Sequence, residues 1–519
     1  MAGEMYAVSG ETLTGIANAI RNKTRSDEFM TVNSMAALIE NIEGVGGDSI
    51  DLTDPVAVYN NTRPSDWLPM PTPADNEIYL LFHIPDGVSS LLAFTVTCTG
   101  NYTIALGSVH DGAFVQMSST IVASGRKYEA ELFADEYGNL TSSGMKQVMV
   151  KVSGTNIKTW KPSTHRKKTS PSNFARWNIV EIACRLPSGV TIACGNSNEN
   201  LALDKMRYFT CYGKNKVTSV DSMFYDCYSL TAIPQLDTSL VTNMSNMFYN
   251  CYALTAIPQL NTSSVTNMSY MFYDCYALTA IPQFDTSSVK NMNSMFYSCY
   301  SLTSIPQLDT SSVTNINRLF YNCYSLTAIP QLNTSSATSM NDMFHDCYAL
   351  TSIPQLDTSS VTNMSYMFYN CYSLTSIPQL DTSSVTGMTY MFYSCYSLTA
   401  IPQLDTSSVK NMDSMFYNCY ALTAIPQLNT SSVTDMDYMF RSCYSLTEVL
   451  LDNTVTGWGG YAISLSSCSL GHAAIVKFFD SLPTITSTKA ITLTGNPGVS
   501  ELTGTEKAVA TGKGWTLTL

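Results

Sequence analysis

Ten cysteines recur at intervals of 24 residues, without an insertion or a deletion between any two copies. They are Cys227, Cys251, Cys275, Cys299, Cys323, Cys347, Cys371, Cys395, Cys419 and Cys443. A fixed period between about 20 and 50 residues is typical of stacked coils rather than of a globular domain. The period therefore predicts a solenoid over nearly half of the chain, and it favours binding over catalysis.

Several positions stay apolar in every copy. The position of Met271 is methionine in all copies except one, where it is Leu319, and the positions of Leu278 and Ile281 never become polar. In-register residues of neighbouring coils lie about 4.8 Å apart. Identical apolar residues then form continuous buried stripes, and each coil is stable only when its neighbours cover it.

Each copy also carries residues that predict its local structure. Leu-Thr-Ala-Ile-Pro predicts a short strand, Asp-Thr-Ser-Ser predicts a tight Asx turn, and Asn-Met-x-x-Met-Phe predicts an irregular or 3₁₀ segment. Proline cannot donate a hydrogen bond to a ladder, so the recurrent proline is expected to end the strand.

The repeat resembles the bacterial BspA-type leucine-rich repeat, which combines Met-Phe-x-x-Cys-x-x-Leu-Thr with Asp-Thr-Ser-x-Val-Thr-Asn-Met. The resemblance covers about residues 217–451. The coils are slightly shorter than is usual in the family, with Ile-Pro-Gln-Leu where Leu-Asp-Leu is common. The resemblance implies a solenoid and a role in surface adhesion or recognition.

The regular cysteines could form disulfides, hold metal or pack as buried thiols. Disulfides need Cβ atoms about 3.8 Å apart, which is closer than the spacing of stacked coils. Metal sites favour clusters such as Cys-x-x-Cys, which this chain lacks. A ladder of buried, unpaired thiols is the favoured interpretation, and so many free thiols indicate synthesis in a reducing cytosol.

Other positions vary from copy to copy, namely the two residues before the methionine and the residue two before the cysteine. A changing strip on a constant scaffold indicates either a recognition surface or relaxed selection on solvent-exposed positions. Recurrent tyrosine favours ligand contact, because tyrosine combines apolar area with a hydroxyl. The predicted ligand-binding residues, here called the varied strip, are Tyr270, Arg318, Asp342, His345, Tyr366, Tyr390, Tyr438 and Arg441.

One further position is always Asp or Asn, from Asp237 to Asn429. Stacked carboxylates repel one another, so these residues are either solvated turn residues or ligands of a cation. We favour the turn and predict no specific metal and no cofactor.

Composition excludes several classes of function. A net charge of −13 argues against nucleic acid as the main partner. No apolar run of 18 residues predicts a membrane span, and the N-terminus lacks the pattern of a secretory signal. The five histidines are scattered and no catalytic motif occurs, so the chain is not expected to be an enzyme. A depolymerase that uses a carboxylate pair on the solenoid remains an open alternative.

Residues 1–44 predict two short amphipathic helices, followed by a glycine-containing linker at 45–51. The string from Gly10 to Thr24, with Met30-Thr-Val and Met35-Ala-Ala-Leu-Ile-Glu, resembles the N-terminal segment of phage tail and minor structural proteins. The resemblance implies an anchor to other tail or baseplate proteins.

Residues 52–212 predict a β-sandwich or jelly roll, 213–451 the solenoid, and 452–519 a leucine-rich-repeat cap with helices at His472–Leu482 and Val499–Thr511. A basic segment at 158–168 predicts a solvated loop or a contact with an anionic glycan. The expected strands of the sandwich are Glu77–Ile84, Leu91–Thr99, Tyr102–Val109, Tyr128–Phe133, Gln147–Val152, Ile179–Leu186, Val190–Cys194 and Met206–Tyr212.

Together these features favour a phage or prophage tail protein that binds a host surface glycan or protein and resides in the virion after synthesis in the host cytoplasm. The alternatives are a bacterial cell-surface adhesin and a glycan-degrading tail spike. Stoichiometry stays open, with a homotrimer as a candidate because trimers are common in tail fibres.

Overall fold

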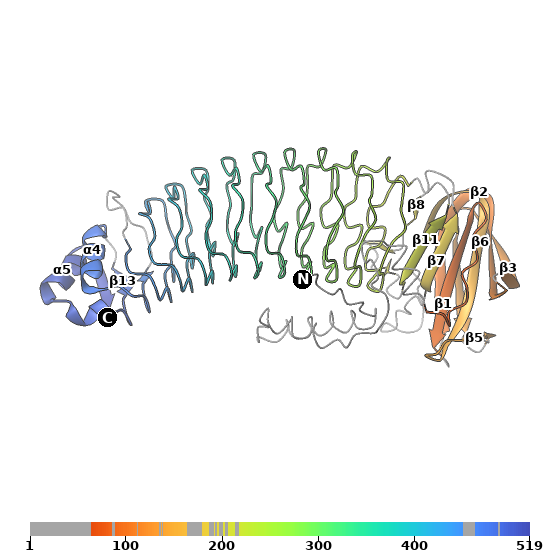
Figure 1. The fold of residues 1–519 in the computed structure, drawn as a ribbon, viewed down its shortest axis with the longest axis horizontal. Helices are drawn as coiled ribbons and strands as arrows, with labels where there is room; N and C mark the ends of the chain where they lie inside the picture. Colours follow the sequence, from red (N-terminus) through yellow and green to blue (C-terminus); the bar gives the residue numbers. More distant parts are fainter. Residues whose placement is uncertain are drawn as a thin grey trace, which may run out of the picture. The chain divides into compact units, whose positions relative to one another are not determined.

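A computed structural model of the chain describes residues 64–85, 89–111, 113–133, 136–137, 139–162, 179–185, 191–192, 195–196, 201–202, 206–212, 217–449, 462–485 and 488–519 (Figure 1). The chain divides into two compact units, Met1–Ser288 and Val289–Leu519. The predicted helical anchor and linker, residues 1–51, lie outside the described residues, as do residues 163–168 of the basic segment.

The first unit contains a nine-stranded sheet with the main strand order β11-β7-β1-β6-β2-β3. Its neighbouring strands are antiparallel except for the pairs β11–β7 and β6–β8. A separate pair joins β9 (Gly195–Asn196) to β10 (Leu201–Ala202). The strands of the sheet are β1 (Glu77–Pro85), β2 (Ser89–His110), β3 (Ala113–Ala123), β4 (Lys127–Phe133), β5 (Asn139–Leu140), β6 (Met145–Pro162), β7 (Ile179–Arg185), β8 (Thr191–Ile192) and β11 (Tyr208–Tyr212).

The hydrogen bonds correct two details of the predicted β-sandwich. Strand β2 pairs with β4 along its first half and with β3 along its second half, so β1–β8 and β11 form one connected sheet, apart from the β9–β10 pair. Two predicted strands, Leu91–Thr99 and Tyr102–Val109, are halves of β2. Alternation of apolar residues reveals which face is buried, but it does not reveal which strand lies alongside.

The first coil of the repeat continues the edge of this sheet. Strand β11 pairs with β7, and Tyr208 of β11 forms a bridge with Ala232. The ring of Phe209 meets the ring of Phe224 edge to face, with centroids 5.2 Å apart. The sheet therefore covers the apolar end that the coils of this unit would otherwise expose.

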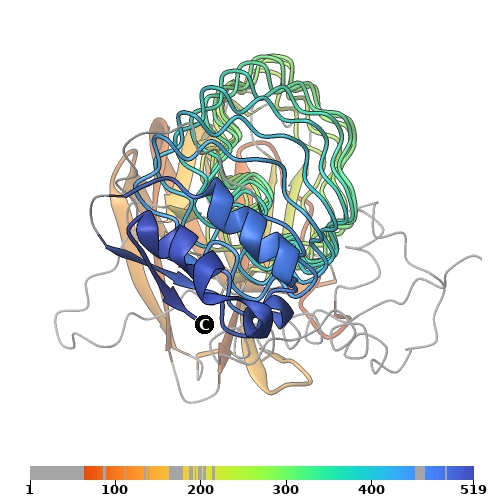
Figure 2. The same cartoon turned by 90° about the vertical axis from the view of Figure 1, so that its left-hand side faces the viewer.

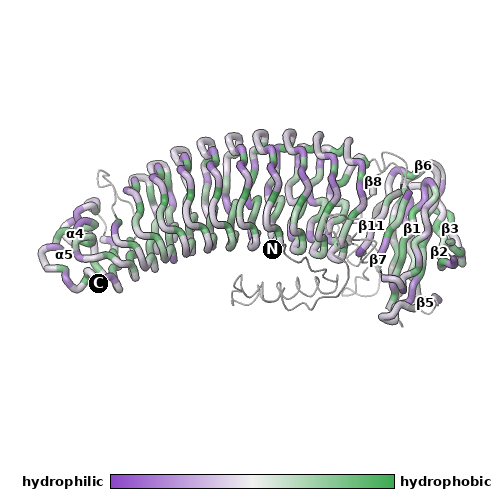
Figure 3. The backbone as a smooth tube through the Cα atoms, viewed as in Figure 1, coloured by the Kyte–Doolittle hydropathy of each residue, from purple (hydrophilic) through white to green (hydrophobic). Residues whose placement is uncertain are grey.

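Within each unit, successive coils stack with the 24-residue period, and their hydrophobic positions recur as bands (Figures 1 and 3). Alternate backbone N–H groups bond within a coil and to the next one. The N–H of Met367 donates to Met364 O at 3.2 Å, whereas that of Phe368 donates to Met391 O at 2.9 Å. The predicted irregular segment is thus a run of tight turns.

The predicted strand at Leu-Thr-Ala-Ile-Pro is wrong for most coils. Coil-to-coil bridges instead lie at the residue before the Met of Asn-Met, for example between Asn363 and Gly387. At the predicted strand a single backbone bond joins most neighbouring coils, such as Thr375 N to Thr351 O at 3.2 Å. Proline lacks the N–H that a longer ladder would need.

The second unit ends in a three-stranded parallel sheet of β12 (Ile463–Ser464), β13 (Lys489–Thr492) and β14 (Trp515–Thr518). Two helices, α4 (His472–Ser481) and α5 (Gly504–Gly512), lie beside it in blue in Figure 2. The predicted first helix is confirmed. The second splits into a 3₁₀ turn, η2 (Pro497–Glu501), and α5, because Thr503 forms a capping box with Glu506. Their role as a cap stays a prediction.

Among the helices that the structure describes, none is both long and apolar enough to cross a membrane.

Candidate functional site

Each described coil holds two non-glycine residues in the left-handed region of backbone space. The first precedes the methionine and the second precedes the cysteine. The second position is always Asp, Asn or Ser, and Asn and Asp tolerate this conformation best. The first position is the varied one, and it includes Arg318 (φ 55°), Asp342 (57°), Tyr366 (59°), Tyr390 (56°) and Tyr438 (54°).

The structure brings most of the varied strip together in the second unit. The rings of Tyr366 and Tyr390 stack at 5.0 Å, and the ring of His345 stacks on that of Tyr369 at 4.5 Å. A tilted contact of 6.2 Å between Tyr369 and Tyr390 joins these two columns of rings. His345, Tyr366 and Tyr390 therefore form one aromatic surface.

Two arginines complete this surface. The Nε atom of Arg318 lies 3.0 Å from Asp342 Oδ2, so these strip residues form an ion pair. The Arg441 guanidinium lies 5.6 Å from the ring centre of Tyr438, in a cation–π arrangement. Tyr270 lies in the first unit, where its ring meets that of Tyr273 at 6.0 Å, so it is not part of the group in the second unit.

Ring stacking explains why tyrosine recurs two residues before the cysteine. Tyr369 has a ring on each side, His345 at 4.5 Å and Tyr393 at 4.6 Å, so both of its faces are covered. A ligand would meet ring edges and hydroxyls rather than open ring faces. Burial raises the pKa of Tyr366 and of Tyr369, so both phenols are protonated hydrogen-bond donors at neutral pH.

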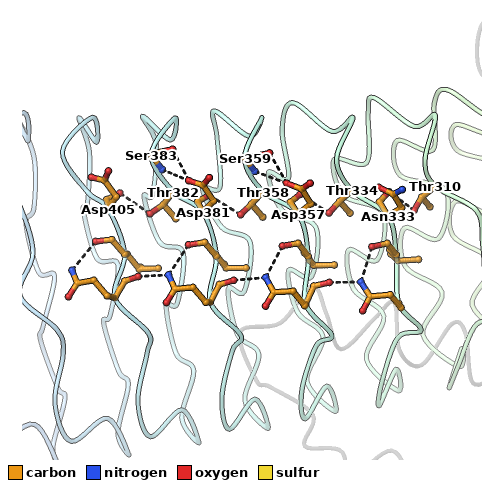
Figure 4. Close-up of a pocket in the computed structure, with 18 of the residues that line it drawn as sticks. Thr310, Asn333, Thr334, Asp357, Thr358, Ser359, Asp381, Thr382, Ser383 and Asp405 are labelled. Atoms are coloured by element: carbon orange, nitrogen blue, oxygen red, sulfur yellow. Dashed lines mark hydrogen bonds between the residues drawn. The ribbon is translucent and has the colours of Figure 1, made fainter.

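A groove with a volume of about 1610 Å³ is a second candidate site, and it was not predicted from the sequence. It runs along several coils of the second unit and is lined by the recurrent Gln, Leu, Asp or Asn, and Thr of each coil. Figure 4 shows one row of this lining, with Asp357, Asp381 and Asp405 alternating with threonines. The first unit has a smaller groove of about 770 Å³ lined by the same positions, from Gln235 to Asp285.

Glutamines form one row of the groove. The Gln355 amide nitrogen donates to Gln379 O at 2.6 Å and to Leu356 O at 3.1 Å, so both of its hydrogens are used. The side-chain oxygens of Gln331, Gln355, Gln379 and Gln403 accept no hydrogen bond from the part of the chain that the structure describes. This row therefore presents acceptors to the groove.

Carboxylates form the other row. Asp357 Oδ1 accepts hydrogen bonds from Ser359 Oγ at 2.7 Å and from Ser359 N at 3.1 Å, which confirms the predicted Asx turn. The serine hydroxyl, followed by its backbone N–H, lowers the pKa of Asp357 and likewise of Asp381 through Ser383. No Lys, Arg or His is among the residues that line the groove, so it offers acceptors and negative charge.

The sequence does carry a signal for this groove, because the residue after each Ile-Pro is Gln in every copy from Gln235 to Gln427. A constant polar residue beside buried apolar ones indicates a structural or binding role. The groove itself forms between side chains of successive coils, and a residue pattern does not show where that surface is hollowed.

The predicted ladder of buried thiols is confirmed within each unit. The Cys371 thiol is fully buried and donates to Phe344 O at 3.1 Å, and Cys395 donates to Phe368 O at the same distance. Burial raises the pKa of both thiols, which keeps them protonated and unreactive.

Known proteins resemble the repeat region. Residues 218–326 and 302–399 match the family model described as "Mycoplasma protein of unknown function, DUF285", and residues 364–488 match the BspA type Leucine rich repeat region. Neither of these models covers the N-terminal segment, so its resemblance to phage tail proteins stays a prediction. No curated protein matches the chain significantly.

Solved leucine-rich-repeat structures are also similar. A leucine-rich repeat protein from Eubacterium ventriosum has 20% identity and a TM-score of 0.33, over 56% of this chain and 91% of that chain. The functional domain of InlJ from Listeria monocytogenes, described as including a cysteine ladder, has 14% identity and a TM-score of 0.19, over 61% of this chain and 65% of that one. Residues 364–488 are therefore similar to a BspA type leucine-rich repeat region.

Proposed function

We propose that this chain is a tail-associated receptor-binding protein of a phage or prophage, and that its coils bind a glycan or protein on the bacterial surface. Residues 1–44 join it to other tail or baseplate proteins in this proposal, and the mature protein resides in the virion. It binds its ligand without changing it chemically, and neither nucleic acid nor a membrane is its partner.

The unfavourable backbone position of the varied residues is the observation that carries this proposal. Tyr366, Tyr390 and Tyr438 occupy left-handed positions, where a non-glycine side chain costs about 1–2 kcal/mol. Asn or Gly would be more stable there. Residues held in an unfavourable backbone conformation are typical of functional surfaces, where the surrounding structure tolerates the strain.

The chemistry of the groove supports a ligand that is rich in hydrogen-bond donors. Gln355 and its equivalents offer side-chain oxygens, and the carboxylates opposite stay ionised because the pKa of Asp357 and Asp381 is lowered. Hydroxyl groups of a glycan or amino groups of a cationic partner match such a lining. The groove and the varied strip each extend over several coils.

The proposal is tested by replacing Tyr366, Tyr390 and Tyr438 with Ala and measuring the binding of labelled protein to host cells. We expect weaker binding with only a small drop in melting temperature, because Tyr438 is exposed and Tyr366 and Tyr390 are half-buried at the surface. Exposed turn residues of the same unit, changed by Ser360→Ala and Ser384→Ala, provide a matched control. Unchanged binding by the triple variant would exclude the varied strip as the receptor site.

The ligand chemistry has its own test, which is the pair Asp357→Asn and Asp381→Asn. This change removes two charges and preserves the Asx-turn acceptor, so we expect weaker cell binding without unfolding. Binding that resists both this pair and the tyrosine variant would exclude these tyrosines and these two carboxylates as receptor contacts.

A bacterial surface adhesin is the second candidate, and the BspA-type repeat region favours it. Fractionation of a lysed producing culture separates the two. Co-sedimentation with tailed particles supports the tail protein, whereas recovery only in the cell envelope of intact bacteria supports the adhesin. In either case surface polysaccharide is expected to stay intact on incubation with the pure protein, and its loss would indicate a glycan-degrading tail spike.

A further inference from the structure

Strand β3 is an open, apolar edge of the sheet in the first unit. It pairs only with β2 among the described strands, and most of its side chains are exposed on both faces. Val115 is 49% exposed, Met117 60% and Ile121 70%. Its sequence, Ala-Phe-Val-Gln-Met-Ser-Ser-Thr-Ile-Val-Ala, contains no charged residue and no proline.

Soluble proteins usually protect such an edge. Charged residues, especially lysine, together with proline or very short strands prevent a free row of N–H and C=O groups from pairing with another chain. Strand β3 has no charged residue and no proline, and it is 11 residues long, or about 37 Å. Its bulge at Met117 is a protective feature, but it leaves both arms of the strand exposed. An exposed apolar edge of this kind indicates a protein–protein contact.

A central bulge divides β3 into two arms. Leu106 of β2 pairs with Ser118 and Gly107 pairs with Gln116, so Met117 is the extra residue. The bulge shifts by one residue the alternation of side chains between the two faces of the sheet. As a result, Phe114 and Ile121 point to one face of the sheet, because their partners on β2 lie six residues apart.

By the same register, Val115 and Thr120 point to the opposite face, because their partners Ser108 and Ile104 lie four residues apart. The two arms therefore mirror each other across the bulge in face and in character. From its outer part towards the bulge, the first arm carries an apolar, a β-branched and a polar residue, which are Phe114, Val115 and Gln116. In the same direction, the second arm carries Ile121, Thr120 and Ser119.

We propose that β3 pairs with β3 of a second copy of this chain in an antiparallel dimer whose two-fold axis passes through the bulge. Phe114 then lies beside Ile121 of the partner subunit, and Val115 lies beside Thr120 of the partner subunit. Both pairs keep their faces, as cross-strand neighbours must. A two-fold contact requires such a self-complementary surface.

Charge and area favour a second copy as the occupant. The chain carries a net charge of −13, and the uncharged edge is a place where two copies can meet without direct repulsion between opposed residues. Two strands of this length remove on the order of 1,000 Å² from water, which reaches the lower limit for a specific interface. The proposal does not depend on the function of the coils.

The test is the mass of the full chain in solution, measured by light scattering and sedimentation for the natural sequence and for the double variant Val115→Lys, Ile121→Lys. We expect a dimer for the natural sequence and at least a tenfold weaker self-association for the variant. Leu240→Lys provides the matched control, because Leu240 is 51% exposed outside the sheet and its replacement leaves the dimer intact. A monomeric natural chain overturns the proposal, as does an oligomer that the double lysine variant does not weaken.

A second variant addresses the case in which the lysines disturb folding. Ser118→Cys places a thiol next to the axis, so the two copies of residue 118 lie within roughly 8 Å of each other. A short bis-maleimide should then yield a covalent dimer for Ser118→Cys, but not for Leu240→Cys or for the natural chain. Equal cross-linking in all three overturns the proposal.

Discussion

The nine-stranded sheet of the first unit and the coils of the second unit hold neighbouring backbone segments in register by different interactions. In the sheet, β1 pairs with β6 along its whole length, from Glu77 opposite Ser153 to Pro85 opposite Met145. In the coils, the backbone bridges are isolated, and the same side chain stacks on its copy in the next coil, as Phe344 does on Phe368. A repeated residue thus replaces part of the hydrogen-bond ladder as the element that aligns neighbours.

The two regions should also differ in cooperativity. Sheet pairs join residues far apart in sequence, such as Glu77 and Ser153, whereas coil contacts join residues about one period apart, such as Phe344 and Phe368 at 5.6 Å. In a solenoid, stability is close to a sum of local coil and interface contributions. Damage is therefore expected to remain local in the coils and to spread in the sheet.

The largest expected effect comes from Phe368→Ala, compared with Phe82→Ala in the sheet. Both rings are fully buried, so each change costs about 3–5 kcal/mol of unfolding free energy. Hydrogen exchange checks the contrast. Phe368→Ala should expose amides in the adjoining coils only, whereas Phe82→Ala should expose amides across the sheet. Exchange that spreads over all coils of the second unit would break the comparison.

Cys371→Ser should have the next largest effect. The hydroxyl can still donate to Phe344 O, but a more polar group then occupies a fully buried position. We expect a loss of about 1–3 kcal/mol in denaturant unfolding. Cys98→Ser, at a half-buried position of the sheet, is the control and should cost less than about 0.5 kcal/mol. Equal losses at both sites would argue against the thiol ladder as a stabilising element.

A smaller effect, of opposite sign, is expected for Tyr438→Gly. Glycine relieves the left-handed strain, worth about 1–2 kcal/mol, while the exposed cation–π contact with Arg441 is lost at about 0.5–1 kcal/mol. The variant should therefore gain up to about 1.5 kcal/mol in denaturant unfolding while it binds cells less well. Lower stability would show that the tyrosine belongs to the scaffold rather than to the recognition surface.

The smallest effect concerns Glu506, whose pKa is lowered to about 2 by the backbone N–H of Thr503, by His472 and by the Thr503 hydroxyl. A lowered folded pKa contributes stability above the ordinary value of 4.5, and this contribution disappears as the pH falls towards about 2. Glu506→Gln should therefore lower the melting temperature at neutral pH but not near pH 2. A difference that is independent of pH would mean that the charge of Glu506 does not stabilise α5.

Sequence reasoning located several elements closely, because their cause is local. Strand β1 and helix α4 begin and end near the predicted residues, and the Asx turn at Asp357 follows from its own Ser359. Strand β3 was missed, because it is exposed on both faces and lacks the alternation that marks a half-buried strand. The bridges at Asn363 were missed because pairing between coils depends on neighbours in space.

The candidate sites also combine features that the sequence shows with contacts that depend on neighbouring coils. The varied positions are visible in the sequence, but the ion pair between Arg318 and Asp342 and the stack of Tyr366 on Tyr390 are contacts between different coils. The groove beside Gln355 is lined by residues of several successive coils, so the pattern alone did not reveal it.

The amino-acid sequence by itself determined the 24-residue period, the apolar positions that become buried and the residues that vary, because a repeat displays its equivalences directly. Only the tertiary structure decided that the varied residue lies in the left-handed region, that glutamines and carboxylates face one groove, and that β3 has a single neighbour among the described strands. The physical reason is that a position with the same residue in every copy specifies which side chains of neighbouring coils meet. It does not specify the backbone angles and bends that decide which of their atoms stay free for a partner.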